Sequence, residues 1–157
     1  MKKDSKLSSV LHVLLHMAHS KRPLTSEELA GYLHTHSVVV RRVLAGLREL
    51  GYVESSKGHG GGWSLACDLS QVSLRDIYDA VGSPSVFAMG NRAENPACLV
   101  EQAVNEALDD AFSEAHALLI SRLGRISLAD LSADFSRRLS QHSGDSFHEH
   151  GHTSSQG

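Results

Sequence analysis

Apolar residues recur at three- and four-residue steps between Ser37 and Gly51, the spacing of a helix that packs by one face. Ser37 is suited to cap the start of this helix, and Gly51 is suited to end it. The stripe that would pack consists of Val40, Val43, Leu44, Leu47 and Leu50. At 100° per residue the opposite side carries Val38, Arg42, Ala45 and Glu49, with Arg41 and Arg48 on its flanks.

Two more helices are predicted before this one. The first carries an apolar stripe and must end before Pro23; the stripe is Leu7, Val10, Leu11, Leu14, Leu15 and Ala18. The second opens at Thr25, which with Glu28 matches a capping box. Only a short linker precedes Ser37, so the second and third helices predict a helix-turn-helix. Such pairs also occur as plain packing units.

A β-hairpin is predicted directly after the third helix. Its strands are residues 52–57 and 63–67, and the tip is the glycine-rich GHGGG. Lys57 and His59 give the tip cationic or donor character, and glycines let its backbone approach a partner closely. A phosphate-binding loop is the rival interpretation of such a tip. It is disfavoured because the chain returns into a strand and lacks the Gly-Lys-Ser/Thr ending.

The second half of the chain predicts a helix over residues 70–82, capped by Ser73 and Asp76, and a loop over 83–97. A long helix then runs from Cys98 to about Gly124, with a wide apolar band that one small domain cannot cover. The band is Val100, Val104, Leu108, Ala111, Phe112, Ala115 and Leu119. Ser127 and Asp130 cap a final helix through Leu139, and the polar residues 140–157 are predicted to be disordered.

The fold class is therefore mainly α with a small β-hairpin wing. Residues 1–82 form a winged helix-turn-helix domain, 83–97 a loop, 98–139 a dimerisation helix with the final helix, and 140–157 a His/Ser/Gly-rich tail. Pairing with the same helix of a second subunit would cover the apolar band.

Charge is distributed unevenly over the 157 residues. Residues 1–65 hold nine Lys/Arg and five Asp/Glu (9 − 5 = +4), while residues 66–157 hold six and thirteen (6 − 13 = −7). A basic front half on an acidic chain indicates a local anionic partner such as nucleic acid, because counterion release acts patch by patch. The alternative is that these charges only solvate the surface.

The apolar start of the chain could be taken for a signal peptide, but histidines interrupt it and no small-x-small cleavage site follows. No apolar stretch reaches the roughly 20 residues that cross a bilayer. A cytoplasmic protein is predicted.

His12, His16 and His19 have metal-compatible spacing, yet no Cys or carboxylate is placed to complete a coordination shell, so solvated histidines are favoured. His148, His150 and His152 in the tail are likewise expected to bind metal adventitiously or not at all.

The segment from Leu24 to Gly82 resembles the winged-helix domain of the IscR/NsrR group of bacterial regulators, the Rrf-two family. The most specific parts are the wing GHGGGWSLA and the following SLRDIYDAV helix. Residues 38–42 (VVVRR) and the later Asn95-Pro96-Ala97-Cys98 are most similar to the YwnA-like branch. The resemblance spans about residues 5–139.

This resemblance implies a homodimeric transcription factor, in most members a repressor, that binds double-stranded DNA. A pseudo-palindromic site would receive one copy of the third helix in each of two successive major grooves. Ser37 and the helix start would hold phosphate, Val38 a thymine methyl and Arg42 a guanine edge. Lys57 and His59 would hold the DNA backbone or the minor groove. The complete predicted set is Ser37, Val38, Val39, Arg41, Arg42, Lys57, Gly58, His59 and Gly60.

Several members of the family sense iron, nitric oxide or redox state. Those with an iron–sulfur cluster use three closely spaced cysteines between the wing domain and the long helix, where this chain has only Cys98. No cofactor is therefore predicted. Cys98 is the sensor candidate, because a thiol at a helix start is favoured as the reactive thiolate. An inert cysteine at the dimer interface is equally compatible.

Two other classes of function are compatible with such a fold. A winged helix can also serve protein association without specific DNA binding. An enzyme is not predicted, because no nucleophile elbow, paired carboxylates or histidine–carboxylate pattern needs a reaction to explain it.

Overall fold

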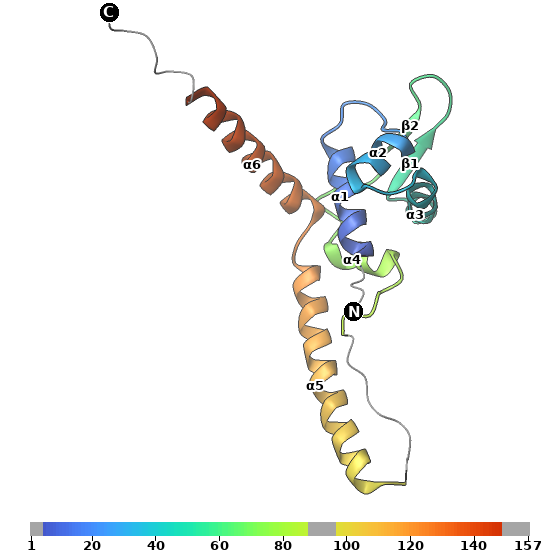
Figure 1. The fold of residues 1–157 in the computed structure, drawn as a ribbon, viewed down its shortest axis with the longest axis vertical. Helices are drawn as coiled ribbons and strands as arrows, with labels where there is room; N and C mark the ends of the chain where they lie inside the picture. Colours follow the sequence, from blue (N-terminus) through green and yellow to red (C-terminus); the bar gives the residue numbers. More distant parts are fainter. Residues whose placement is uncertain (1–4, 88–96, 149–157) are drawn as a thin grey trace, which may run out of the picture.

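The computed structural model describes residues 5–87 and 97–148, which form helices and one β-hairpin (Figure 1). The elements are, in chain order, α1 (Lys6–Ala18), α2 (Ser26–Leu33), α3 (Ser37–Glu49), β1 (Val53–Ser56), β2 (Gly62–Leu65), α4 (Leu74–Ala80), α5 (Leu99–Gly124) and α6 (Leu128–His148). The first three helices and the hairpin form one lobe, with α4 beside α1. The helices α5 and α6 project from this lobe in different directions. The predicted fold class is confirmed.

The core of the lobe lies between α1, α2, α3 and α4. Each of these helices buries one face, as the apolar spacing predicted. The largest fully buried side chains are Leu14, Leu29, Leu44, Leu47, Val53, Ile77 and Leu128. The α2 capping box forms as predicted, since the Thr25 hydroxyl accepts from the Glu28 amide and the Glu28 carboxylate accepts from the Thr25 amide. Helix α4 has the same box at Ser73 and Asp76.

The two strands pair antiparallel, with Val53 opposite Leu65 and Ser56 opposite Gly62. The predicted wing is therefore present, with slightly shorter strands. Its base is joined to the segment before α2, because Leu24 and Trp63 exchange backbone hydrogen bonds of 2.9 and 2.8 Å. A Cβ on Gly62 would lie 2.6 Å from the Leu24 carbonyl oxygen. Only glycine allows the two backbones to come this close.

The turn between α5 and α6 is fixed to the lobe by backbone hydrogen bonds. The Leu74 amide donates to the Ile126 carbonyl, and the Leu128 amide donates to the Val72 carbonyl, each over 2.8 Å. The Leu128 side chain completes the core. Helix α5 itself buries no residue completely, and at 26 residues it is about 39 Å long. None of the helices in the described ranges is long and apolar enough to cross a membrane.

Three details differ from the sequence predictions. The cap position of α3 is His36, so the proposal that Ser37 caps this helix is wrong, and Ser37 is its first residue. Leu50 is exposed, because it lies at the C-cap where the helix ends. Helix α6 continues to His148, whereas the prediction ended it at Leu139 and expected disorder from residue 140. The remainder of that tail and residues 88–96 of the predicted loop lie outside the described residues.

Candidate nucleic-acid interface

The first turn of α3 carries exposed apolar side chains, and a cation follows. Val38 is 58% exposed on the outer face, and Arg42 is also exposed on that face one turn later. Val39, which is 47% exposed, lies at the side of the helix and lines a cavity behind it. Within the described part of the chain Arg42 has no ion-pair or hydrogen-bond partner. A methyl-rich first turn followed by a free guanidinium can contact base edges, where valine meets a thymine methyl and arginine meets guanine.

The start of α3 is also free of a side-chain cap. His36 makes no capping hydrogen bond, although its carbonyl accepts from the amides of Val39 and Val40. The first amides of a helix lack partners inside the helix and carry the positive end of its dipole. This end of α3 can therefore take an anion such as a DNA phosphate.

Arg41 is occupied by contacts within the protein. Its guanidinium forms a 2.6 Å ion pair with Glu27 of α2 and a 3.2 Å hydrogen bond to the Ser37 hydroxyl. Both members of the ion pair are more than half exposed, so the pair stabilises little. It does orient Arg41 along the junction of α2 and α3. Sequence analysis missed Glu27, because a pair 14 positions apart has no signature in helical spacing.

Arg48 links α3 to the wing. Its guanidinium donates to the Ser55 hydroxyl of β1 over 3.0 Å and lies 5.7 Å from the centre of the Trp63 ring. The Trp63 indole N–H in turn donates to the Ser26 hydroxyl at the start of α2, over 3.0 Å. These contacts fix the wing against α2 and α3. They were not predicted, because they depend on tertiary placement.

The tip of the wing presents Lys57 and His59, both exposed and without an ion-pair or hydrogen-bond partner within residues 5–87 and 97–148. The tip turns at Gly58 and Gly60, whose φ angles are +90° and +78°. The Gly61 amide donates to the Gly58 carbonyl and closes the turn. The predicted residues thus divide into two groups, the start of α3 and the wing tip, with Arg41 turned toward α2.

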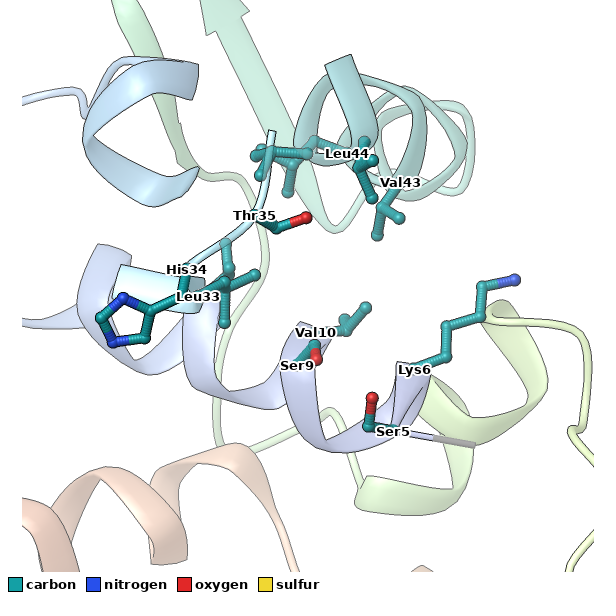
Figure 2. Close-up of a pocket in the computed structure, with 12 residues that line it drawn as sticks. Ser5, Lys6, Ser9, Val10, Leu33, His34, Thr35, Val43 and Leu44 are labelled. Carbon is teal, nitrogen blue, oxygen red and sulfur yellow. The ribbon is translucent and has the colours of Figure 1, made fainter. Parts of the chain in front are cut away.

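A cavity of about 590 Å³ lies behind α3 (Figure 2). Its walls come from the first turns of α1, the turn after α2, and the inner side of α3. Val10, Leu33, Val43 and Leu44 give it apolar walls, while Ser5, Ser9 and Thr35 add hydroxyl groups. Lys6 stands at its edge, where its ammonium donates to the Val81 carbonyl over 2.8 Å. The first half of α3 is therefore packed less fully than the second.

The two cysteines have different surroundings. Cys98 is half-buried and occupies the N-cap position of α5. Cys67 follows β2 and is half-buried against the core, and this burial raises the pKa of its thiol. Both are free thiols.

Comparisons with known proteins agree with this arrangement. The profile of the Rrf2 family, described as iron-dependent transcriptional regulators, matches residues 3–134. YwnA of Bacillus subtilis strain 168, provisionally assigned as an HTH-type transcriptional regulator, is 29% identical over 128 residues, covering 82% of this chain and 95% of YwnA.

Solved structures show the same fold. The crystal structure of a provisionally assigned transcriptional regulator from Lactobacillus plantarum is 28% identical, with a TM-score of 0.70 over 90% of this chain and 98% of the other. The IscR of T. potens is similar in fold alone, with 18% identity and a TM-score of 0.62 over 85% and 88% of the two chains.

The family description raises the question of an iron site. Iron–sulfur clusters are commonly held by about four cysteine thiolates, sometimes with histidine in place of two. This chain has two cysteines, and the raised pKa of Cys67 disfavours its thiolate. Within the described ranges no three His, Cys, Asp or Glu side chains gather into a metal-binding group. The residues present therefore do not fit a cysteine-held cluster within one chain.

Proposed function

The chain belongs to the Rrf2 family of transcriptional regulators, and on that premise we propose that it is a repressor that binds a pseudo-palindromic DNA site as a homodimer. The observation that carries the proposal is the outer face of α3. There exposed Val38 and Arg42, which has no partner among the described residues, follow an uncapped helix start. The wing tip adds Lys57 and His59, which are also exposed. A repressor would act by occupying its site and excluding other proteins from it.

In this proposal the first two turns of α3 enter the major groove. Val38 contacts a thymine methyl and Arg42 a guanine edge, while Ser37 and the helix start hold a phosphate. Lys57 and His59 contact the backbone or the adjacent minor groove. Arg41 contributes to position rather than to base choice, because its guanidinium is already engaged by Glu27.

The test is a titration of operator DNA at two salt concentrations. Arg42→Ala should weaken operator binding by about 1–3 kcal/mol and relax the preference at one base pair, whereas Lys57→Ala should weaken all sequences alike and reduce the salt slope. Arg75→Ala is the matched control, since Arg75 is an exposed arginine on α4 that pairs with Asp79. If both test variants bind like the parent, this docking is wrong.

The proposal is distinguished from its rival, a winged helix used for protein association, by a mobility shift with the DNA upstream of the gene. A sequence-preferring band at moderate salt supports the regulator. Its absence from both reduced and oxidised samples would favour protein association.

The homodimer is supported by the exposed apolar side chains of α5. Val100 and Val104 are 73% and 51% exposed, and Leu108, one turn further along, continues the same surface. Apolar residues of this number on one helix are typical of a face that a partner covers. Val104→Glu should lower the mass measured by light scattering toward that of one chain and weaken operator binding, because two linked half-sites bind more tightly than one. A dimeric Val104→Glu protein would place the interface elsewhere.

Redox response is the least supported part of the proposal, and it rests on Cys98. A thiol at the N-cap of α5 lies where the long helix leaves the lobe, so its oxidation by peroxide to a sulfenic acid would add a polar group beside the proposed interface. Peroxide should then change operator affinity in the parent and leave Cys98→Ser unaffected. An equal response in both would assign Cys98 an inert role.

A further inference from the structure

Two histidines on α1 converge on one point. His12 and His16 lie one helical turn apart, and their Nε2 atoms are 3.0 Å apart. Their ring centres are 4.8 Å apart, with an angle of 32° between the planes. On its other side His16 lies flat against Tyr32 of α2, with a centre-to-centre distance of 3.8 Å and an interplanar angle of 1°. The stack restricts the orientation of the His16 ring and so keeps its Nε2 atom toward His12.

The short contact between the two rings is a hydrogen bond. Two neutral imidazoles in this position share one hydrogen, because one nitrogen donates while the other accepts. The pKa of His16 lies below its ordinary value of 6.5, through burial and then through the positive charge that His12 or His19 would carry. A neutral imidazole is the form that binds metal.

The distance between the nitrogens also matches two ligands of one metal ion. With metal–nitrogen bonds of about 2.0–2.1 Å, two ligands stand about 3.3 Å apart in tetrahedral geometry. They stand about 2.9 Å apart at right angles, as in square-planar or octahedral geometry. The observed 3.0 Å lies between these values. Two histidines at positions i and i+4 are also the spacing by which one helix face presents two nitrogens to zinc.

We propose that His12 and His16 bind a divalent transition-metal ion of the zinc, nickel or copper type. The ion takes the place of the hydrogen shared by the two Nε2 atoms. That hydrogen moves through solvent to the Nδ1 atom of the same ring, so both ligands stay neutral imidazoles. Imidazole ligands select these metals over magnesium or calcium, which prefer oxygen. Because no third His, Cys, Asp or Glu gathers there within the described ranges, water completes the coordination and the ion exchanges readily.

His19 offers a matched control on the same helix. Its Nε2 atom is hydrogen-bonded to the Ser132 hydroxyl of α6 over 3.1 Å, and its ring packs edge-on against Phe135 at 4.7 Å. It is therefore held toward α6 and away from the pair. Replacing His19 removes one imidazole from α1 and leaves both proposed ligands in place.

The experiment is calorimetric titration of the full chain with Zn²⁺ at pH 7.5, after treatment with a chelator. The background carries asparagine at the histidines of the C-terminal segment, which are His142, His148, His150 and His152, so that the tail does not contribute. Sites formed by other residues remain in every variant and cancel in the comparison. His12→Ala and His16→Ala should each lower the affinity of one site at least tenfold, and the double variant should lose no more than either single one. His19→Ala should bind as the background does.

A second measurement keeps the test independent of folding effects of the substitutions. In the unsubstituted α1, nitrogen NMR should show the Nε2 signals of His12 and His16 shifting together on addition of one equivalent of Zn²⁺, with the His19 signal unmoved. The proposal is overturned if the two signals do not shift. It is equally overturned if both alanine variants bind Zn²⁺ as tightly as the background.

Discussion

The hydrogen bond from Trp63 to Ser26 should stabilise the contact between the wing and α2 by an amount that can be measured. The two side chains are 9% and 7% exposed and lie 3.0 Å apart, so removal of either partner leaves the other buried without its bond. An unsatisfied buried polar group costs about 1–3 kcal/mol, which is the expected loss of unfolding free energy for Ser26→Ala. Thr25 remains as the helix cap in that variant. Trp63→Phe also loses ring volume and the contact with Arg48, and should cost about 2–4 kcal/mol.

The double variant separates these contributions. Once both partners are gone no buried group remains unpaired, so the double variant should be about 1 kcal/mol more stable than the sum of the single losses predicts. Urea unfolding followed by far-ultraviolet circular dichroism is the suitable assay, because Trp63 is the only tryptophan and its fluorescence is lost on substitution. Ser64→Ala, a neighbouring serine outside the core, is the control and should change stability by less than about 0.5 kcal/mol. If the losses of unfolding free energy in the two single variants simply add up in the double variant, the hydrogen bond between Trp63 and Ser26 does not help to hold the wing against α2.

Two further predictions concern stability. Gly46 lies inside α3, and a Cβ there would meet nothing within 4 Å, so Gly46→Ala should raise the unfolding free energy by about 0.5–1 kcal/mol in urea titrations; a loss would mean that the helix is distorted there. For Glu28, the Arg22 guanidinium and then the Thr25 amide lower the pKa to about 2 from an ordinary 4.5. Because the folded pKa is the lower one, the stabilisation is present above pH 4.5 and is lost as the pH falls toward 2. Glu28→Gln should therefore lose less stability than the parent between pH 5 and 2.5 in thermal melts, and an unchanged pH profile would contradict this origin.

Local signals in the sequence were sufficient for the elements that depend on neighbouring residues. The capping boxes at Thr25, Ser73 and Ser127 span three positions each, and all three form. The cap predicted at Ser37 failed for a tertiary reason, because its hydroxyl accepts a hydrogen bond from Arg41 instead. Arg41 is itself held by Glu27 on another helix, which no periodicity could indicate.

The end of α6 shows a second limit of pattern-based prediction. The lack of large apolar residues after Leu139 predicts the end of the helix there, but apolar residues determine packing and not helix formation itself. The hydroxyls of Ser136 and Ser140 donate to the carbonyls four residues earlier, which is how a serine inside a helix satisfies its hydroxyl. The exposed wing cations and the outer face of α3 were predictable, because they follow from helical geometry and from the position of the hairpin tip.

The close approach of Gly62 to Leu24 has a consequence for how such a domain can diverge. The glycines of the wing serve two separate purposes. Gly58 and Gly60 shape the tip. Gly62 lies at the base of the wing, where its backbone contacts Leu24 and a side chain would collide with the Leu24 backbone. The tip can change in length and charge to suit a new operator without disturbing the rest of the domain. The base of the wing at Gly62 cannot change in this way, because any larger residue there would push the whole wing away from α2. Changes of DNA preference should therefore accumulate at the tip and on the outer face of α3, while the contact between Gly62 and Leu24 stays unchanged.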